Sequence, residues 1–172
     1  MEIEIESRVV ADTNVLVAFS VVGELELLKS LFKRIWIPRA VRIELIDQGE
    51  GWIAAENVQR LIMQEESWIK TFELPIDDHP VWSEQSLDPG ETEVIASVFR
   101  FGDLALLDEV PARRKARALG IDFIGSLGVL RMAREREFID EVRTIIRGMQ
   151  AGGIRFGDSL VKQFLIELGE SP

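Results

Sequence analysis

Five short apolar runs are separated by amphipathic helical patterns along most of this chain, and this alternation restricts the folds it can form. The runs cover residues 8–11, 35–37, 68–74, 104–107 and 121–124. The stretches between them place apolar residues three and four positions apart, as helices with one buried face do. The alternation predicts an α/β fold with a mainly parallel central sheet.

The chain has 172 residues, which is enough for one domain with its own core. It shows no internal repeat, low-complexity tract or linker. We therefore expect a single domain over residues 1–172, with residues 138–172 as a C-terminal helical extension.

The composition restricts both the location and the partners of the protein. No apolar run approaches the ~20 residues that cross a bilayer, and the first residues are acidic where a secretory leader would be basic. We expect a cytoplasmic protein. The formal net charge of −10 argues against a protein that coats nucleic acid through unspecific phosphate contacts.

The metal-binding residue types are equally restrictive. The chain has no cysteine and one histidine, His79, which excludes disulfides and zinc sites with several imidazoles. His79 falls in a polar stretch, residues 75–89, that reads as a surface loop. Any metal must be held mainly by oxygen, which suits Mg²⁺ or Mn²⁺.

Polar residues follow three of the predicted strands directly. Asp12 follows the first, Asp108 the fourth and Ser126 the fifth. In a parallel sheet these positions share one edge, and ligands bind in the crevice outside the carboxyl ends of the strands. Taken alone, Asp12 and Asn14 are explained equally well as an Asx turn or a helix cap, and Ser126 as the cap of the following helix.

Two further acids lie on predicted helices. Glu44 lies on a helix predicted over residues 38–48, with Pro38 as its first residue, one turn from apolar positions of its inward face. On the next acidic helix, Glu91 aligns with the apolar face and points inward, whereas Glu93 falls almost opposite and points outward. An ordinary acidic first turn also explains Glu91 and Glu93 without any function.

Several carboxylates in one crevice repel each other unless a cation pairs with them. A divalent cation among carboxylates indicates phosphodiester hydrolysis, which needs neither histidine nor cysteine. The helix predicted after Asp108 is basic, and it can hold the flanking phosphates or simply be a solvated face. Its basic residues are Arg113, Arg114, Lys115 and Arg117.

The chain also resembles the PIN-like domains, most closely those of prokaryotic toxin–antitoxin loci. The resemblance rests on motifs that occur in order over most of the chain. They are Asp-Thr-Asn-Val-Leu at 12–16, Ile-Pro-Arg-Ala-Val at 37–41 leading to Glu44, Leu-Asp-Pro-Gly-Glu-Thr-Glu at 87–93, Leu-Leu-Asp-Glu at 106–109, and Leu-Gly at 119–120 with Ile-Gly-Ser-Leu-Gly-Val-Leu at 124–130.

This resemblance implies a three-layer α/β/α sandwich and a metal-dependent endoribonuclease that is the toxin of a toxin–antitoxin pair. It also implies an RNA substrate, homodimerisation and a small antitoxin as partner. The implied catalytic and metal-binding acids are Asp12, Glu44, Glu91 and Asp108, with Thr13, Asn14 and Ser126 as polar neighbours and Arg113, Arg114 and Arg117 as RNA contacts.

Departures from the family pattern leave alternatives open. Relatives often have two aspartates after the fourth strand, where this chain has Asp108 and Glu109, and either can reach the metal. Glu93 matches the pattern as well as Glu91 does. Val110 and a proline replace a frequent basic pair, so a PIN-like binding or assembly module without catalysis is the alternative function. A phosphoacceptor receiver domain is disfavoured because residues 121–126 lack its lysine.

Overall fold

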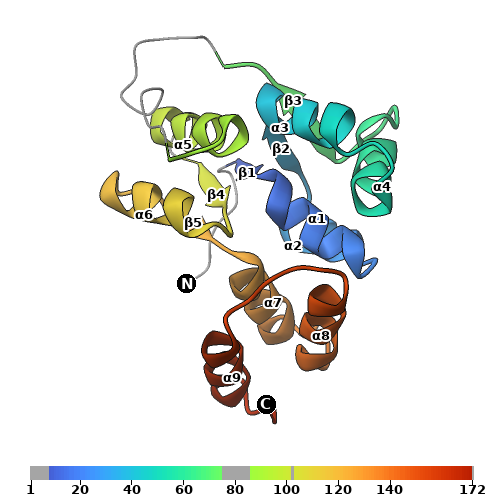
Figure 1. Cartoon of the computed structure of the whole chain (residues 1–172), viewed down its shortest axis with the longest axis vertical. Helices are drawn as coiled ribbons and strands as arrows, with labels where there is room; N and C mark the ends of the chain where they lie inside the picture. Colours follow the sequence, from blue (N-terminus) through green and yellow to red (C-terminus); the bar gives the residue numbers. More distant parts are fainter. Residues whose placement is uncertain (1–7, 75–85, 102, 172) are drawn as a thin grey trace.

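The central sheet has five strands, all parallel, in the order β3-β2-β1-β4-β5 (Figure 1). The structure is a computed structural model that describes residues 8–74, 86–101 and 103–171, apart from the side chain of Gln48. The strands are β1 Val9–Ala11, β2 Ile35–Pro38, β3 Ile69–Phe72, β4 Leu104–Leu106 and β5 Phe123–Ile124. The predicted α/β fold with a parallel sheet is confirmed.

Helices cover both faces of the sheet and complete a three-layer sandwich. Helix α5 packs on β1, β2 and β4 beside α3 and α6, whereas α1 packs against α2, α4, α7 and α8. Their bounds are α1 Thr13–Val21, α2 Leu25–Phe32, α3 Arg39–Ile43, η1 Glu44–Gln48, α4 Ile53–Ile62, α5 Pro89–Phe101, α6 Val110–Ala118, α7 Ser126–Glu135, α8 Arg143–Ala151 and α9 Asp158–Glu167.

Strand β1 is the centre of the fold. All three of its residues are buried, and it pairs with β2 on one side and β4 on the other. The chain runs from β1 outward through β2 to β3, then returns to place β4 and β5 on the opposite side. The order therefore reverses between β1 and β4, and in open parallel sheets such a reversal opens the crevice that binds ligands.

Two local predictions are wrong by one residue. Pro38 ends β2 and caps α3 with an extended backbone, so the predicted helix begins one residue later. It extends to Gln48 as predicted, although from Glu44 it takes the form of the π-helical turn η1, a geometry frequent at functional sites. Gly125 caps α7, and Ser126 is the first helical residue.

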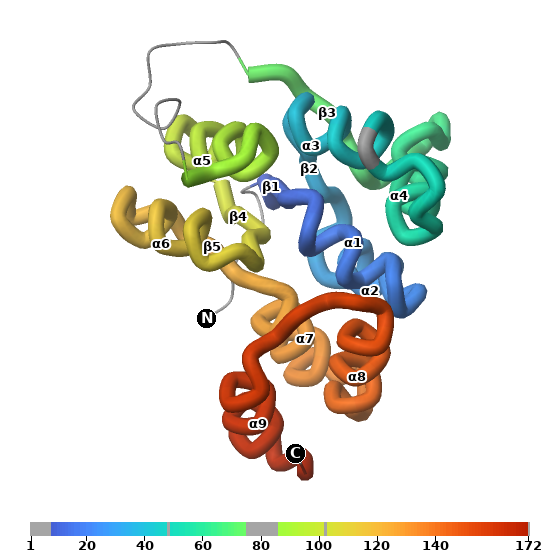
Figure 2. Tube along the Cα trace, in the orientation of Figure 1, coloured from blue at the N-terminus to red at the C-terminus, as the bar shows by residue number. Residues whose placement is uncertain are grey.

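Helices α8 and α9 lie at the end of the long axis opposite α3 and α5 (Figures 1 and 2). In the described part of the chain, no helix is long and apolar enough to cross a membrane. The predicted loop histidine, His79, lies outside the described residues.

Candidate metal centre

Three carboxylates from distant parts of the sequence converge beside the carboxyl end of β1. They belong to Asp12, Glu44 and Asp88, and each offers one oxygen that lies within 4.8 Å of the other two. Asp12 follows β1, Glu44 begins η1, and Asp88 directly precedes α5. We call these three residues the acid cluster.

Asp12 is the buried member of the acid cluster, with 1% of its surface exposed. Its backbone N–H donates to the carbonyl of Leu106 at 3.1 Å, which fixes it against the end of β4. Its Oδ2 accepts a hydrogen bond from the N–H of Asn14 at 3.4 Å as it caps α1. The buried Oδ1 accepts none from the described residues. A buried carboxylate oxygen without a donor is costly, and a cation removes that cost.

Glu44 is oriented by donors on two different helices. The hydroxyl of Thr13 donates to its Oε2 at 2.7 Å, and the N–H of Gly90 donates to its Oε1 at 3.0 Å. A Cβ atom at position 90 would lie 2.8 and 2.9 Å from the two carboxylate oxygens. Glycine at this position therefore allows the first turn of α5 to approach Glu44.

Asp88 and Glu91 form a capping box at the start of α5. The N–H of Glu91 donates to Oδ1 of Asp88 at 2.7 Å, and the N–H of Asp88 donates to Oε2 of Glu91 at 3.1 Å. Glu91 is 4% exposed, so it lies inward, as the helical pattern predicts. The reciprocal bonds hold Asp88 at the positive end of the helix, facing Asp12 and Glu44.

Sequence reasoning missed Asp88. It lies at the end of a stretch that reads as a surface loop, although its signal is present in the sequence. An aspartate followed by proline and then by glutamate three residues later is the pattern of a helix start with a capping box. Asp88 both caps α5 and presents a carboxylate to the acid cluster.

Burial and neighbouring negative charges raise the pKa of three carboxyl groups in this region. The pKa of Asp12 lies well above its usual value, first because of burial and then because of the charge of Asp88. Burial, followed by the charge of Asp88, also raises the pKa of Glu44. The pKa of Glu91 is raised to about 7 by burial and by the charges of Asp88, Glu109 and Glu44. A bound cation would oppose all three shifts because it favours the ionised form.

Both carboxylate oxygens of Asp108 accept hydrogen bonds from Ser126, the first residue of α7. The N–H of Ser126 donates to Oδ1 at 2.7 Å and its hydroxyl donates to Oδ2 at 2.6 Å. A Cβ atom at Gly125 would lie 2.8 Å from Oδ1, so this approach also depends on glycine. Asp108 lies at the predicted edge of the sheet, but it is not among the three acids that converge.

Glu109 lies nearer the other predicted acids. Its Oε1 accepts a hydrogen bond from the side-chain amide of Asn14 at 3.5 Å, and its charge contributes to the raised pKa of Glu91. The two acids that follow β4 therefore contact different parts of the molecule. Asp108 accepts hydrogen bonds from the start of α7, whereas Glu109 lies on the side of Asn14 and Glu91.

Glu93 contacts another helix, so its predicted outward orientation is wrong. Its Oε2 accepts a hydrogen bond from the backbone N–H of Ala40 at 2.8 Å. Ala40 lies in the first turn of α3, the helix that leads directly into Glu44. Glu93 supports the segment that carries Glu44 and is not itself among the three converging acids.

The basic helix predicted to contact RNA is α6. The guanidinium groups of Arg113 and Arg117 each lie 5.5 Å from the centre of the Phe123 ring on β5, while Arg114 is exposed. The ring thus orders two of the three cations at the edge strand of the sheet.

Comparison with known proteins identifies the family. A family model described as PIN domain matches residues 8–170. The chain belongs to the PIN domain family. PIN domains are typically nucleases and generally use a divalent metal, and the resemblance of the sequence motifs to PIN-like domains is confirmed.

A solved structure is also similar to this PIN domain. It is a PilT N-terminus domain protein from the hyperthermophilic archaeon Sulfolobus solfataricus, with 13% sequence identity and a TM-score of 0.49. The similarity covers 87% of this chain and 96% of that chain. Among curated proteins, none matches this chain significantly.

Proposed function

We propose that this PIN domain is a Mg²⁺- or Mn²⁺-dependent endoribonuclease that hydrolyses RNA phosphodiester bonds. The observation that supports it most directly is the acid cluster, in which the buried Oδ1 of Asp12 accepts no hydrogen bond from the described residues. Three oxygen ligands without an imidazole or thiolate fit a hard divalent cation.

Asp12, Glu44 and Asp88 would hold the cation. The donors on Glu44, from Thr13 and Gly90, leave its carboxylate little freedom to turn away. When bound, the cation lowers the pKa of a coordinated water and stabilises negative charge on the phosphate.

RNA binding is proposed for the adjacent basic helix. Arg113, Arg114 and Arg117 lie on α6, which begins directly after Glu109 on the same edge of the sheet as Asp12. Their positive charge suits the phosphates that flank the scissile bond. Because contacts between arginine and phosphate release counterions from the RNA, such binding should weaken as the salt concentration rises.

The biological setting is proposed from the sequence motifs. Their resemblance to PIN-like proteins of toxin–antitoxin loci supports a cytoplasmic toxin that forms a homodimer and is neutralised by a small antitoxin. A neighbouring reading frame for a small protein, and inhibition of RNA cleavage by that protein, would support this role. Cleavage unaffected by the neighbour's product would exclude it as the antitoxin.

Cleavage of end-labelled RNA tests the enzymatic proposal. Wild-type protein should cleave with Mn²⁺ or Mg²⁺ and stop when a chelator is added, and Asp12→Asn should be inactive. Asp140→Asn, an exposed aspartate outside the acid cluster, is the matched control and should cleave normally. RNA cleavage that persists both in the presence of the chelator and in Asp12→Asn would contradict the proposal.

The alternative is a PIN domain that binds or assembles without catalysis. One observation favours it: of the four acids that the sequence motifs imply, Asp12 and Glu44 belong to the acid cluster, but Glu91 and Asp108 do not. Asp108 instead accepts hydrogen bonds from Ser126 with both carboxylate oxygens. Calorimetric titration with Mn²⁺ beside the cleavage assay separates the two readings. Binding that depends on Asp12 but is accompanied by no RNA cleavage would favour the alternative.

A further inference from the structure

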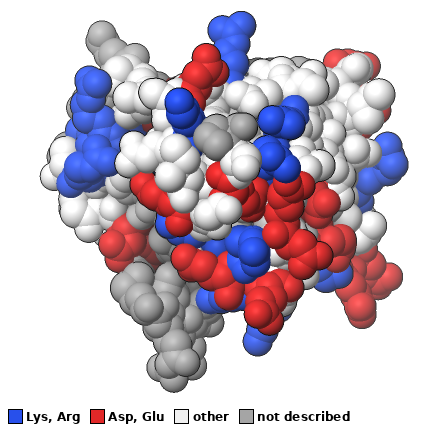
Figure 3. Space-filling model, turned by 90° about the horizontal axis from the view of Figure 1, so that it is seen from below, with Lys and Arg blue, Asp and Glu red and all other residues white. Residues whose placement is uncertain are grey.

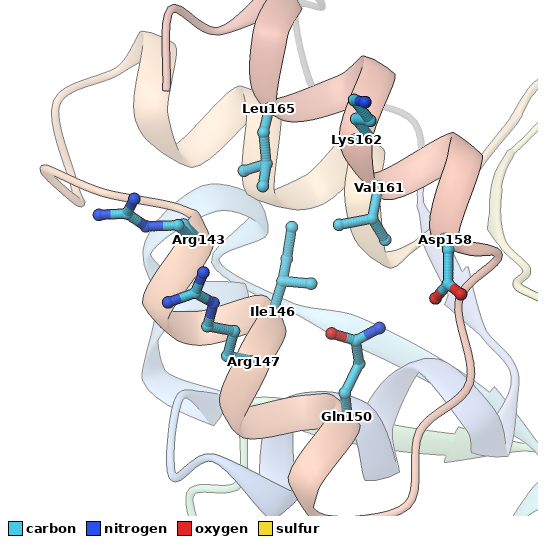
Figure 4. Close-up of a pocket in the computed structure, with 8 residues that line it drawn as sticks. All are labelled: Arg143, Ile146, Arg147, Gln150, Asp158, Val161, Lys162 and Leu165. Atoms are coloured by element: carbon cyan, nitrogen blue, oxygen red, sulfur yellow. The ribbon is translucent and has the colours of Figure 1, made fainter. Parts of the chain in front are cut away.

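Helices α8 and α9 enclose a groove of about 240 Å³ (Figure 4). Helix α8 rests on the last turn of α1, where Cβ atoms added at Gly148 and Gly152 would lie 2.9 and 1.9 Å from side-chain atoms of Val22 and Val21. Asp12 caps the opposite end of α1, which is ~13 Å long at 1.5 Å per residue. A ligand in the groove would not reach the acid cluster directly.

The floor of the groove is apolar. Ile146 from α8 and Val161 and Leu165 from α9 face each other across it (Figure 4). Ile146 and Leu165 are buried and Val161 is partly buried, so the floor joins the core and opens to solvent near α9. It can accept aliphatic side chains.

The rim of the groove is basic. Arg143 and Arg147 from α8 and Lys162 from α9 line it, and Asp158 is the one acidic residue among the described residues of its lining. Arg143 is paired with Glu141. Within the described part of the chain, Arg147 and Lys162 donate no hydrogen bond to a carboxylate. Lys162 is thus available to a ligand, as is Arg147, although the charge of Arg147 also acts on Glu141.

The two helices are held in place without a ligand. Glu170, just after α9, accepts hydrogen bonds from the backbone N–H of Val142 at 2.8 Å and of Arg143 at 2.9 Å, and so closes the start of α8. Arg131 on α7 pairs with Glu167 and lies 5.1 Å from the centre of the Phe164 ring. The groove is therefore formed in advance, which lowers the entropic cost of binding.

We propose that this groove binds an acidic amphipathic helix of a partner protein. Aliphatic side chains of that helix would enter between Ile146 and Leu165, and its carboxylates would face Arg147 and Lys162. An apolar stripe flanked by charge is how helices bind in grooves, and the opposite charges match the rim.

RNA fits the same groove less well. Its phosphates would leave the apolar floor uncovered. Basic side chains are interspersed with acidic ones on the face around these helices and form no continuous basic surface (Figure 3). Nucleic-acid binding surfaces need a basic patch or stripe.

Fluorescence anisotropy tests the proposal on the full chain. The probe is a fluorescein-labelled peptide of about 16 Glu, Leu and Ala residues, long enough for a helix, with leucines three and four positions apart. It should bind wild-type protein, and binding should weaken at least about tenfold in Arg147→Glu/Lys162→Glu. A peptide with glutamine in place of glutamate, or serine in place of leucine, should bind as weakly.

The matched control is Arg34→Glu/Arg60→Glu, which reverses two exposed cations outside the groove and should bind the probe like wild type. Thermal unfolding of both double variants checks that each is folded. Failure of the probe to bind, or equal binding by both double variants, overturns the proposal. It is equally overturned if single-stranded RNA binds the groove and the peptide does not, with loss of RNA binding only in Arg147→Glu/Lys162→Glu.

Discussion

The carboxylate of Glu93 accepts a hydrogen bond from the backbone N–H of Ala40, 2.8 Å away on a different helix. Glu44, which follows the helix of Ala40, accepts one in return from the N–H of Gly90 at the start of α5. A carboxylate from α5 thus accepts a hydrogen bond from the first turn of α3, and a carboxylate from the end of α3 accepts one from the first turn of α5. The position of Glu44 is consequently tied to the position of α5, and with it to Asp88.

Removing this support should destabilise the fold. Glu93→Ala leaves the N–H of Ala40 without its acceptor, and loss of a helix cap costs about 1 kcal/mol. Glu93→Gln keeps an acceptor oxygen and should cost less. The free energy of unfolding in urea measures both variants. Equal stability of Glu93→Ala and wild type would show that the hydrogen bond contributes nothing.

Gly90→Ala should disturb the acid cluster although alanine favours helices. The new methyl group would meet both oxygens of Glu44 at under 3 Å and force that carboxylate to move. Moving a metal ligand by altering its surroundings typically costs about 10–100-fold in metal affinity. Calorimetric titration with Mn²⁺ measures the loss.

Gly128→Ala is the matched control for this prediction. Gly128 lies in α7, where an added Cβ atom meets its nearest neighbour, Ile124, at 3.4 Å, and this variant should bind Mn²⁺ like wild type. If Gly90→Ala binds Mn²⁺ as tightly as Gly128→Ala, the close approach of α5 to Glu44 has no part in metal binding.

Asp88 and Asp108 should respond differently to substitution. Asp88→Asn preserves a capping oxygen for α5 but removes a charge from the acid cluster, so Mn²⁺ affinity should fall at least about tenfold with little change in stability. Asp108→Ala removes the acceptor for Ser126 and should cost about 1–2 kcal/mol of stability. Its Mn²⁺ affinity should change less than that of Asp88→Asn. If Asp108→Ala lost more Mn²⁺ affinity than Asp88→Asn, the result would indicate that the metal site lies nearer α7.

Without metal, Glu91 should make the stability of the protein fall as the pH rises. Glu91 has its pKa raised from 4.5 to about 7, so the folded state binds more protons than the unfolded state between these values. The stabilisation is fully present below about pH 4.5 and is lost as the pH rises through about 7. Glu91→Gln, which can still accept from the N–H of Asp88, should remove this part of the pH dependence.

Urea unfolding of wild type and Glu91→Gln at a series of pH values, in the presence of a chelator, checks the slope. Repeating the series with Mn²⁺ should stabilise wild type most at the upper end of the pH range, because the cation favours ionised carboxylates. Parallel curves for the two proteins in chelator would contradict the assignment of the slope to Glu91.

Hydrophobic periodicity predicts the parallel sheet and the edge at which Asp12 lies, because a buried strand requires an apolar run and the chain must turn where the run ends. Periodicity does not predict which way a side chain points after the strand. Successive residues of an extended chain face opposite sides. Asp108 and Glu109 therefore reach different neighbours, and only the packed structure separates them.

Glu93 and Asp88 escaped prediction for a different reason. A helical wheel assumes that solvent covers the face of α5 opposite its apolar face. Helix α3 packs there instead, and Glu93 accepts a hydrogen bond from it. Asp88 was not predicted because it lies at the end of a polar stretch that reads as a surface loop, although it caps α5. Its second role depends on Asp12 and Glu44, which are distant in sequence and adjacent only after folding.

The reversal of strand order at β1 also determines when this site can exist during synthesis. Asp12 is made before β4, but its backbone is fixed by the carbonyl of Leu106 on that strand, and Asp88 is made only shortly before it. A nascent chain that ends before β4 lacks the carbonyl that fixes the backbone of Asp12. The order of the strands thus makes complete fixation of the acid cluster wait for the synthesis of β4.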